Sequence, residues 1–292
     1  MSDIAVVLMA YGSPSRSDDI PAYLEDIRGG RPVSDAAVEE LVERYRRIGG
    51  RSPLDEITER QRAGLERELG LPVHVGMKHW TPRIAEAAES ALAGGARIVV
   101  GLVLAPHYSR LSIAGYHDRL AEALAGRAEL VFVNSWHDHA PYLDVLADRV
   151  RGTDRHVVFT AHSLPARIRA EGDPYEGQLH ATSQAVAERA ALRDWSFAFQ
   201  SASATGEPWL GPDILEELDA LAARGVRRVL AAPVGFVSDH LEILWDLDVE
   251  GRERAAALGL DFERIESLND DPHFLAGLAE LVRRNVPVPS AG

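Results

Sequence analysis

The 292-residue chain has the length of about two ordinary domains and the composition of a globular protein. Hydrophobic residues make up 46% and charged residues 26%, which excludes disordered and fibrous proteins. Acidic residues outnumber basic ones by 45 to 31, so the net charge is −14. We therefore expect no nucleic-acid partner and no binding to anionic membrane surfaces, because both need an excess of positive charge. Any anionic ligand would therefore have to be bound by arginine side chains close to it.

The chain contains no cysteine, which excludes disulfides, thiolate metal sites, cysteine-ligated iron–sulfur clusters and a cysteine nucleophile. The first apolar run, Ile4–Ala10, is too short for a secretion signal. No apolar run approaches the roughly 18 residues of a membrane span. These observations predict a cytoplasmic protein without a membrane anchor.

Short apolar runs rich in β-branched residues alternate with amphipathic helical stretches along the whole chain. This alternation predicts parallel sheets covered by helices on both faces. We expect an α/β fold with two similar doubly wound, Rossmann-like domains, each with a mostly parallel four-stranded sheet, and a ligand cleft between them. The predicted strands are Ile4–Met9, Val73–Met77, Arg97–Leu104, Glu129–Asn134, His156–Thr160, Ser196–Gln200, Arg228–Ala232 and Asp261–Ile265.

The predicted domains are residues 1–152 and 153–271, and a last helix over 272–286 could pack back on the first domain. The string Ser52-Pro53-Leu54-Asp55 predicts a capped helix start with proline at the first helical position, and Gly70 predicts its end. Thr81-Pro82 and Gly211-Pro212 are predicted to open two further helices.

Ligands of open parallel sheets bind outside the carboxyl ends of the strands. In this chain, polar and aromatic side chains follow several predicted strands directly, and we expect them to share one edge. The strings concerned are Tyr11-Gly12-Ser13-Pro14, Lys78-His79-Trp80, Pro106-His107-Tyr108, Ala161-His162-Ser163 and Ser238-Asp239-His240. That edge is the predicted site.

Glu242, Asp246 and Glu250 are spaced four residues apart, so a helix would carry their carboxylates in one row. A solvated acidic face is the simplest interpretation, but the row begins just after a strand and has apolar neighbours, which suits a path for cations or protons. His162 could accept a proton with an ordinary pKa of about 6.5, or bind a metal. His240 is expected to point away from Glu242, because two helical residues differ by about 200°.

Several familiar catalytic motifs are missing from the sequence. No glycine-rich loop follows the first strand, which argues against a nucleotide-binding enzyme. Neither His-Glu-x-x-His nor Gly-x-Ser-x-Gly occurs, which argues against zinc proteases and serine hydrolases. A group of arginines after the first strand would suit a carboxylate-bearing ligand, although most of them can be explained as solvated helix residues: Arg28, Arg44, Arg46, Arg47 and Arg51.

Taken in order, these strings resemble the ferrochelatase family over nearly the whole chain, from Tyr11 to Glu250. The resemblance is carried by Tyr11-Gly12-Ser13-Pro14, Ile48-Gly49-Gly50-Arg51-Ser52-Pro53-Leu54, Gly76-Met77-Lys78-His79, Leu104-Ala105-Pro106-His107-Tyr108-Ser109, Ala161-His162-Ser163-Leu164-Pro165, Gln200-Ser201-Ala202, Glu207-Pro208-Trp209-Leu210-Gly211-Pro212 and Pro233-Val234-Gly235-Phe236-Val237-Ser238-Asp239-His240-Leu241-Glu242.

The resemblance implies insertion of Fe²⁺, as a substrate, into a porphyrin held between two doubly wound domains, with no organic cofactor. By resemblance, His162 and Glu242 form the catalytic, metal-binding pair, and Asp246 and Glu250 line the metal path. Tyr11 matches the residue on the opposite side of the ring that can act as an axial metal ligand. The remaining positions that match porphyrin and propionate contacts are Arg28, Arg44, Tyr45, Ser52 and Tyr116.

The segment after Tyr11 is polar, unlike the apolar lip of membrane-attached relatives. We therefore expect the coproporphyrin type of ferrochelatase, which makes coproheme from coproporphyrin III, acts as a monomer and passes its product to a coproheme decarboxylase. Alternatives are a protoporphyrin IX ferrochelatase, a cobalt or nickel chelatase of similar fold, and a porphyrin carrier without catalysis. Trp245 and Arg51 stand where the family commonly has other side chains.

Overall fold

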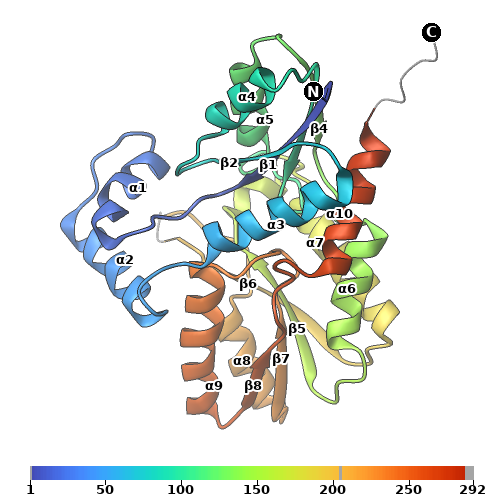
Figure 1. Ribbon diagram of the computed structural model, residues 1–292. Coiled ribbons are helices and arrows are strands. Elements are labelled where there is room, and N and C mark those ends of the chain that lie inside the picture. Colours follow the sequence, from blue (N-terminus) through green and yellow to red (C-terminus); the bar gives the residue numbers. More distant parts are fainter. Residues whose placement is uncertain (1, 204–205, 287–292) are drawn as a thin grey trace.

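The computed structural model describes residues 2–203 and 206–286, which form two all-parallel four-stranded sheets with helices between the strands (Figure 1). The α/β fold predicted from the sequence is confirmed. The first sheet has the order β2-β1-β3-β4, with β1 (Ile4–Ala10), β2 (Val73–Met77), β3 (Ile98–Val103) and β4 (Glu129–Val133). The second has the order β6-β5-β7-β8, with β5 (His156–His162), β6 (Trp195–Gln200), β7 (Arg228–Ala232) and β8 (Asp261–Arg264).

The two sheets repeat one topology. In the first, β1 lies between β2 and β3, so that Leu8 pairs with Val75 on one side and Leu102 on the other. In the second, β5 lies in the same way between β6 and β7. The central strands are apolar and almost fully buried, because helices cover both faces of each sheet. The carboxyl ends of all four strands therefore lie on the same side of each sheet.

Helices alternate with the strands, as the sequence predicted. Their bounds are α1 (Ile20–Ile27), α2 (Asp35–Arg47), α3 (Leu54–Leu69), α4 (Ile84–Ala93), α5 (Ala114–Leu124), α6 (Ala140–Val150), α7 (Tyr175–Ala190), α8 (Ile214–Ala223), α9 (Arg252–Leu258) and α10 (Pro272–Asn285). Short 3₁₀ helices span Ser17–Asp19 and Ala166–Arg169, and a π-helix, η3, spans Ile243–Gly251. None of the described helices is long and apolar enough to cross a membrane.

Three predicted helix starts are wrong by one or two residues. Helix α3 begins at Leu54, so Pro53 is its N-cap, and the Ser52 hydroxyl accepts a hydrogen bond from the Leu54 N–H at 3.3 Å. The two X-Pro pairs precede α4 and α8 without opening them. Asp213 caps α8 instead, with its carboxylate bound to the N–H of Leu215 at 2.8 Å. The predicted stop of α3 at Gly70 is confirmed, because this glycine has a φ of 66°.

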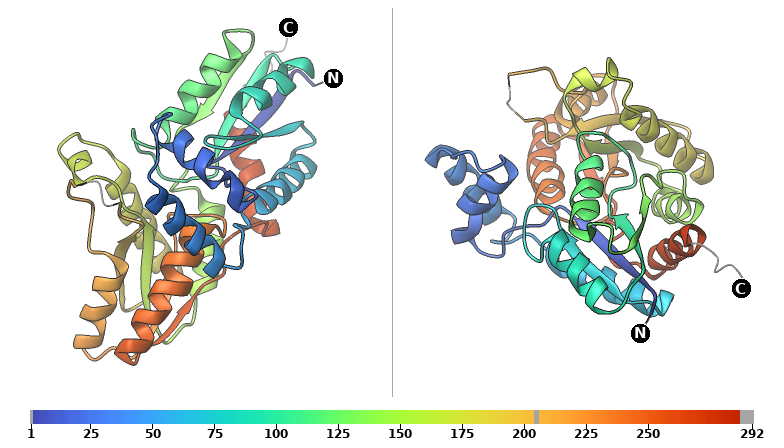
Figure 2. Two further views of the ribbon diagram at one scale, coloured as in Figure 1. Left: turned by 90° about the vertical axis from the view of Figure 1, so that its left-hand side faces the viewer. Right: turned by 90° about the horizontal axis from the view of Figure 1, so that it is seen from above.

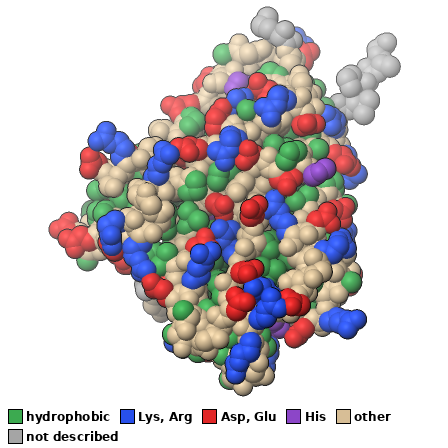
Figure 3. Space-filling view, turned by 60° about the horizontal axis from the view of Figure 1, so that its bottom comes forward, with side chains coloured by type: hydrophobic (Ala, Val, Ile, Leu, Met, Phe, Trp, Pro, Cys, Tyr) green, Lys and Arg blue, Asp and Glu red, His purple; other side chains and the backbone are tan. Residues whose placement is uncertain are grey.

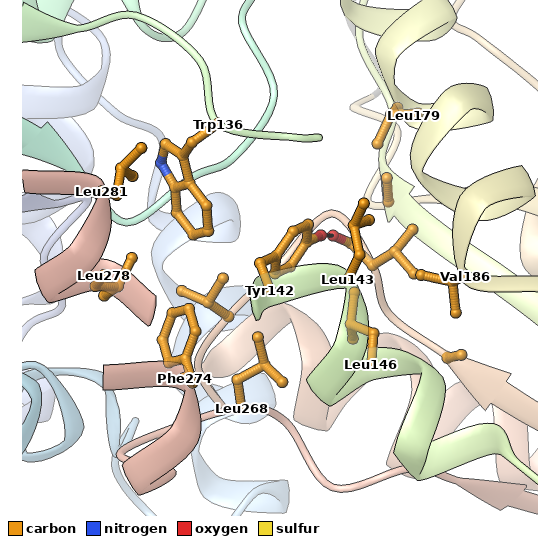
Figure 4. Close-up of a cluster of buried hydrophobic side chains, with 14 of the residues drawn as sticks. Trp136, Tyr142, Leu143, Leu146, Leu179, Val186, Leu268, Phe274, Leu278 and Leu281 are labelled. Carbon is orange, nitrogen blue, oxygen red and sulfur yellow. Dashed lines mark hydrogen bonds between the residues drawn. The ribbon is translucent and has the colours of Figure 1, made fainter. Parts of the chain in front are cut away.

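One apolar core joins the two sheets. It contains side chains of β1 and β3 as well as of β5 and β7, and α6, α7 and α10 fill the space between them. Figure 4 shows the centre of this core, where Trp136, Tyr142 and Phe274 lie together, each about 1% exposed. The Tyr142 hydroxyl also donates to the carbonyl of Val234 in the loop after β7. We call these three side chains the aromatic seam.

Helix α10 returns from the second sheet to pack on α3 and α6. Gly277 allows this close approach, because a Cβ there would lie 2.6 Å from the Cβ of Pro141. The His139 imidazole donates to the Gly277 carbonyl at 2.8 Å, which fixes the start of α6 against α10. The predicted domain limits, 1–152 and 153–271, stay a prediction, but the last helix contacts helices of the first of these segments.

Helices α1 and α2 stand to one side of the body that the two sheets form, as the right-hand view of Figure 2 shows. They lie in the insertion between β1 and α3, and α2 also contacts η3 of the second half. Acidic and basic side chains are interspersed over the face shown in Figure 3. This face therefore offers no broad positive field to an anionic ligand.

The aromatic seam predicts a strong effect of Phe274→Ala. Removal of this buried ring should lower the free energy of unfolding by about 3–5 kcal/mol, and both halves should still unfold in one transition, because they share the core. Denaturant titration followed by far-UV circular dichroism measures this, with His273→Ala, an exposed neighbour on α10, as control. Two separate transitions in the Phe274 variant would contradict a shared core.

Candidate active site

A cavity of about 550 Å³ lies where the carboxyl ends of the two sheets meet. Tyr11 and Lys78 enter it from the ends of β1 and β2, and His162 enters it from the end of β5. The segment after β7 contributes His240 and Glu242. Both halves of the chain therefore build one site, because parallel strands bring the residues that follow them to the same edge.

The centre of the site is a histidine–carboxylate pair. His162 Nε2 lies 3.6 Å from Glu242 Oε1, and the two side chains are 30% and 37% exposed. The other ring nitrogen, Nδ1, faces the Ser163 carbonyl, which can only accept, so Nδ1 carries a hydrogen. A neutral His162 would then direct its Nε2 lone pair at a carboxylate. A proton on Nε2 converts this repulsion into an ion pair.

The pKa values of the pair follow from this geometry. Burial alone would lower the pKa of His162, but the charge and hydrogen bond of Glu242 raise it to about 9. Burial alone would raise the pKa of Glu242, but His162 and His240 hold it well below its usual range. At neutral pH the pair is therefore an imidazolium and a carboxylate. The expectation of an ordinary pKa for His162 is wrong.

His240 faces the same carboxylate, contrary to the sequence-based expectation. Its Nε2 lies 3.6 Å from Glu242 Oε2, and its Nδ1 donates to the Ser238 carbonyl at 2.8 Å. Helical structure begins only at Leu241, so the rotation expected between two helical residues does not apply to His240. The Glu242 carboxylate consequently lies between two imidazoles.

The acidic row continues from Glu242 into the protein along the π-helix η3. Asp246 is 6% exposed and accepts hydrogen bonds from Gln200 Nε2 at 3.1 Å and from the Ser201 hydroxyl. Burial, with Glu242 and Glu250 nearby, raises the pKa of Asp246 to about 6. Burial also raises the pKa of the half-buried Glu250. The solvated-face interpretation of this row is therefore wrong for Asp246, which lies behind the cavity wall.

Tyr11 forms part of the wall built by the first sheet. Its ring is 41% exposed and packs on the His79 ring, with centroids 4.6 Å apart. The Asp26 carboxylate binds His79 Nδ1 at 2.9 Å and Arg83 at 2.8 Å, so the stacked ring is held in place. Burial raises the pKa of Tyr11 well above its ordinary value, so the phenol keeps its proton at neutral pH.

Gly12, directly after Tyr11, is required for this placement. It has a φ of 91°, and a Cβ there would lie 2.8 Å from the Cβ of Trp80. The chain can therefore turn and pass Trp80 closely only with glycine at this position. Any side chain here would move Tyr11 out of the cavity wall.

The structure divides the remaining predicted contacts into two groups. Tyr45, Ser52 and Tyr116 line the cavity, and the Tyr45 hydroxyl lies 2.9 Å from Ser13 Oγ. Arg28 is exposed at the end of α1, next to a lining residue, and does not itself line the cavity. Arg44 is also outside: it pairs with Glu40 at 2.6 Å.

Arg44 has a second contact, with the ring of Trp245 on η3. Its guanidinium carbon lies 5.3 Å from the ring centroid, and that of Arg47 lies 5.2 Å from it. Two cations over one indole hold α2 against η3. We call this arrangement the Trp245 clamp. These contacts explain why a tryptophan stands at position 245.

The sequence analysis gave no role to Lys78 and His107, which both line the cavity. Lys78 Nζ donates to the Ser112 carbonyl at 3.0 Å and lies 4.8 Å from the Tyr116 ring. Burial, together with Arg119, lowers the pKa of Lys78 to about 8, so it is mostly charged at neutral pH. Both residues belong to strand-end strings that the sequence placed at the predicted site, but their residue types alone indicated no individual role.

His107 differs from the other histidines of the site. Its Nε2 lies 2.9 Å from Thr182 Oγ1, and that hydroxyl donates to the His137 carbonyl at 3.0 Å. The hydroxyl must then accept from Nε2, which fixes the tautomer. Burial lowers the pKa of His107 to about 3, so it is neutral.

This arrangement defines a two-sheet α/β protein with a histidine–carboxylate pair in an open cavity at its strand ends. The ferrochelatase family profile matches residues 3–286. The chain therefore belongs to the ferrochelatase family, whose reaction is the insertion of a metal into a porphyrin in haem biosynthesis, and the resemblance found in the sequence is confirmed.

Individual relatives agree with this assignment. A protein of Herpetosiphon aurantiacus named ferrochelatase is 43% identical and covers 95% of this chain and 97% of its own length. A protein of Geobacillus kaustophilus named coproporphyrin III ferrochelatase is 39% identical, with 95% and 94% covered. Among solved structures, SirB from Bacillus subtilis with Fe³⁺ has a TM-score of 0.64 at 11% identity, covering 97% and 95%. The last similarity shows the fold alone.

The coupling of the central pair predicts that Glu242→Gln lowers the pKa of His162. Without the carboxylate charge, burial dominates, so the pKa should fall from about 9 to below its ordinary 6.5. Titration of the imidazole resonances by NMR measures the change. As a control, Asp118→Asn removes a carboxylate 3.0 Å from a different histidine, His117, and should leave His162 unchanged.

The same raised pKa has a consequence for stability. Since the pKa of His162 is higher in the folded than in the unfolded chain, its stabilising effect is complete below about pH 6.5 and is lost as the pH rises through about 9. In the NMR titration described above, a pKa of His162 that stays near 9 in the Glu242→Gln variant would contradict the ion pair.

Proposed function

We propose that this protein inserts Fe²⁺ into coproporphyrin III and produces coproheme, with His162 and Glu242 as the catalytic pair. The observation that supports this most is the charged pair in a cavity built by both sheets. In the overall reaction, Fe²⁺ replaces two pyrrole N–H protons, and both protons leave the ring. A suitable site must bind a divalent cation and accept protons at the same place.

The ion pair can couple these two tasks. Fe²⁺, as a substrate, approaches the Glu242 carboxylate and offsets the negative charge that keeps His162 protonated. The pKa of His162 then falls, the imidazolium releases its proton, and the neutral imidazole can accept one from a pyrrole N–H. The base is thus formed only when metal arrives.

The released protons need acceptors away from the ring. Asp246, with a pKa of about 6, is mostly ionised at neutral pH, so it can take up a proton and release it again. Gln200 lies next to both parts of this path: its Nε2 binds Asp246 and is 3.4 Å from the Glu242 carbonyl. Glu250 continues the row outward along η3.

Tyr11 has a different task on the other wall. Its phenol is protonated at neutral pH, so it is a poor metal ligand before metal reaches the ring. A metal in the porphyrin would favour the phenolate, and Tyr11 would then bind the product axially. The stacking with His79 restricts where the phenol oxygen can lie.

The choice of coproporphyrin III is supported by charge and by relatives. Coproporphyrin has four propionates where protoporphyrin IX has two. Lys78 is a cation inside the cavity, Ser52 and Tyr116 are hydroxyl donors, and Arg28 lies at its edge next to Ile27. Several relatives between 35% and 39% identical are named coproporphyrin III ferrochelatase. A protoporphyrin IX ferrochelatase and a carrier without catalysis remain the alternatives that experiments must separate.

The proposal includes the setting in which the enzyme works. We propose a monomer in the cytoplasm that needs no organic cofactor and no iron–sulfur cluster, takes Fe²⁺ only as substrate, and passes coproheme to a decarboxylase. The composition supports part of this, because the chain contains no cysteine.

We predict that His162→Ala loses metal insertion by about 10²- to 10⁴-fold while porphyrin binding survives, because the proton acceptor is removed and the walls remain. Glu242→Gln should be slowed severely, and Asp246→Asn and Glu250→Gln less. Anaerobic mixing with porphyrin and Fe²⁺, followed by absorption spectra, measures the rate, and porphyrin fluorescence measures binding. Near-normal turnover of the His162 variant would refute the assignment.

We predict that coproporphyrin III is preferred over protoporphyrin IX, and that Lys78→Met reduces this preference about tenfold or more, since a charged hydrogen bond contributes roughly 1.5–3 kcal/mol. Arg28→Ala should weaken coproporphyrin binding in the same direction. Both porphyrins are compared with and without detergent, to control for aggregation. Arg16→Ala, an exposed arginine of the same insertion, is the control. Protoporphyrin preference that survives these controls would contradict the substrate assignment.

A further inference from the structure

A buried arginine outside the cavity connects the two ends of the segment that carries the acidic row. Arg264 is the last residue of β8, and its side chain is 10% exposed. Its guanidinium binds Asp248 in a fork, with Nε 3.1 Å from Oδ1 and Nη2 2.8 Å from Oδ2. Its third nitrogen, Nη1, donates to Asp239 Oδ1 at 3.0 Å. Asp239 precedes Glu242 by three residues, and Asp248 follows it by six.

Asp239 is held by further groups from the loop after β8. Ser267 Oγ donates to it at 2.6 Å and Asn269 Nδ2 at 3.0 Å. The backbone is fixed as well, because the Asp239 N–H donates to Asn269 Oδ1 at 2.9 Å and the Asn269 N–H donates to the Val237 carbonyl at 2.7 Å. From α3, Gln61 reaches Ser238 Oγ at 2.9 Å. The turn that leads into Glu242 is therefore bound on several sides.

This cluster is not explained by stability alone. Its two carboxylates are also largely buried, with 22% and 19% of their side chains exposed, against 10% for the arginine. Removing such charges from water costs about as much as their attraction returns, so an apolar cluster of equal size would stabilise the fold as well. An arginine that binds carboxylates in a fork fixes their position and orientation, because its five donors fit carboxylates only in a defined geometry.

The segment between the two carboxylates needs such a constraint. It contains the first part of the π-helix η3, a rare conformation whose backbone is less favourable than an α-helix. A shift of this segment toward α-helical geometry would rotate Glu242 relative to His162 on β5. Asp239 anchors the chain before η3 and Asp248 anchors it within η3; both are bound to the end of β8, which opposes that shift.

We propose that Arg264 is a positioning residue that, by binding Asp239 and Asp248 together, holds η3 in its π-helical register and keeps the Glu242 carboxylate between His162 and His240. Arg264 touches neither the cavity nor the three residues it positions. Its effect on metal insertion rests on the proposed function, but its effect on the conformation of residues 240–250 does not.

Arg155 provides a matched control at the opposite end of the same sheet. Its side chain is 9% exposed and pairs with Asp261 at 2.9 Å and with Glu263, so it too is a largely buried arginine between two carboxylates. It precedes β5, far along the chain from the strand ends that form the site. Its carboxylate partners are 56% and 59% exposed, against 22% and 19% for those of Arg264, so Arg155→Gln should lower the thermal midpoint no more than Arg264→Gln does.

The first test measures conformation. Hydrogen–deuterium exchange followed by mass spectrometry should show at least tenfold faster exchange in residues 240–250 of Arg264→Gln, and no such change there in Arg155→Gln. Arg264→Lys keeps the charge but loses the fork, so it should restore the thermal midpoint more than the protection of η3. Equal protection of residues 240–250 in wild type and Arg264→Gln overturns the proposal. If Arg264→Gln does not fold, Asp248→Asn, which removes one anchor, is tested in the same way and decides it.

The second test measures catalysis. Arg264→Gln should lower kcat for iron insertion at least tenfold with little change in the KM for porphyrin, and it should have almost no further effect in a Glu242→Gln background, because it acts through Glu242. Full additivity of the two substitutions overturns the proposal. Faster exchange of η3 with an unchanged kcat would instead leave the positioning role intact and refute the catalytic role proposed for Glu242.

Discussion

The shared apolar core is the constraint on which the site depends. The strand ends of each parallel sheet carry functional groups, but the cavity is lined by residues of both halves. The aromatic seam of Trp136, Tyr142 and Phe274, with α10 packed back on α3 and α6, fixes the sheets so that these edges face each other. Because the core is continuous, a residue after β5 and a residue after β1 keep a constant separation across the cavity.

That rigidity makes the electrostatics of the site effective. A carboxylate between two imidazoles in a partly buried place interacts with them more strongly than it would in water. The protein thereby keeps Glu242 ionised and His162 protonated at neutral pH, although burial acts against both charges. In the proposed reaction, a cation that binds the Glu242 carboxylate would lower the pKa of His162 and release this proton.

The architecture could be predicted from the sequence because the signals were local and strong. Continuous apolar runs placed all the strands within one or two residues, and Pro272–Asn285 had the periodicity of an amphipathic helix. Strand-end placement brought Tyr11, His162 and Glu242 to one edge. The shared core could not be predicted, because the same apolar residues would fit two separate cores equally well.

Other parts of the site depend on conformations that a sequence pattern does not contain. The π-helix η3 could not be predicted from the sequence, because an apolar pattern is interpreted with the period of an α-helix. The direction of His240 was wrong because helical structure begins only at Leu241, a boundary that the sequence does not show. Arg44 was expected at a propionate, but its guanidinium lies over Trp245, a contact between segments about 200 residues apart that no local pattern indicates.

The aromatic seam also bears on how the flat porphyrin proposed as substrate would enter and leave the cavity. The seam packs aromatic rings between the two halves, so a motion that separated the sheets would have to open this packed core. Helices α1 and α2 lie outside the seam, and α2 contacts the second half through the Trp245 clamp and through the Arg47–Glu253 ion pair. Because Trp245 adjoins Asp246 on η3, a displacement of α2 during entry or exit of the proposed substrate would act on the helix that carries the acidic row.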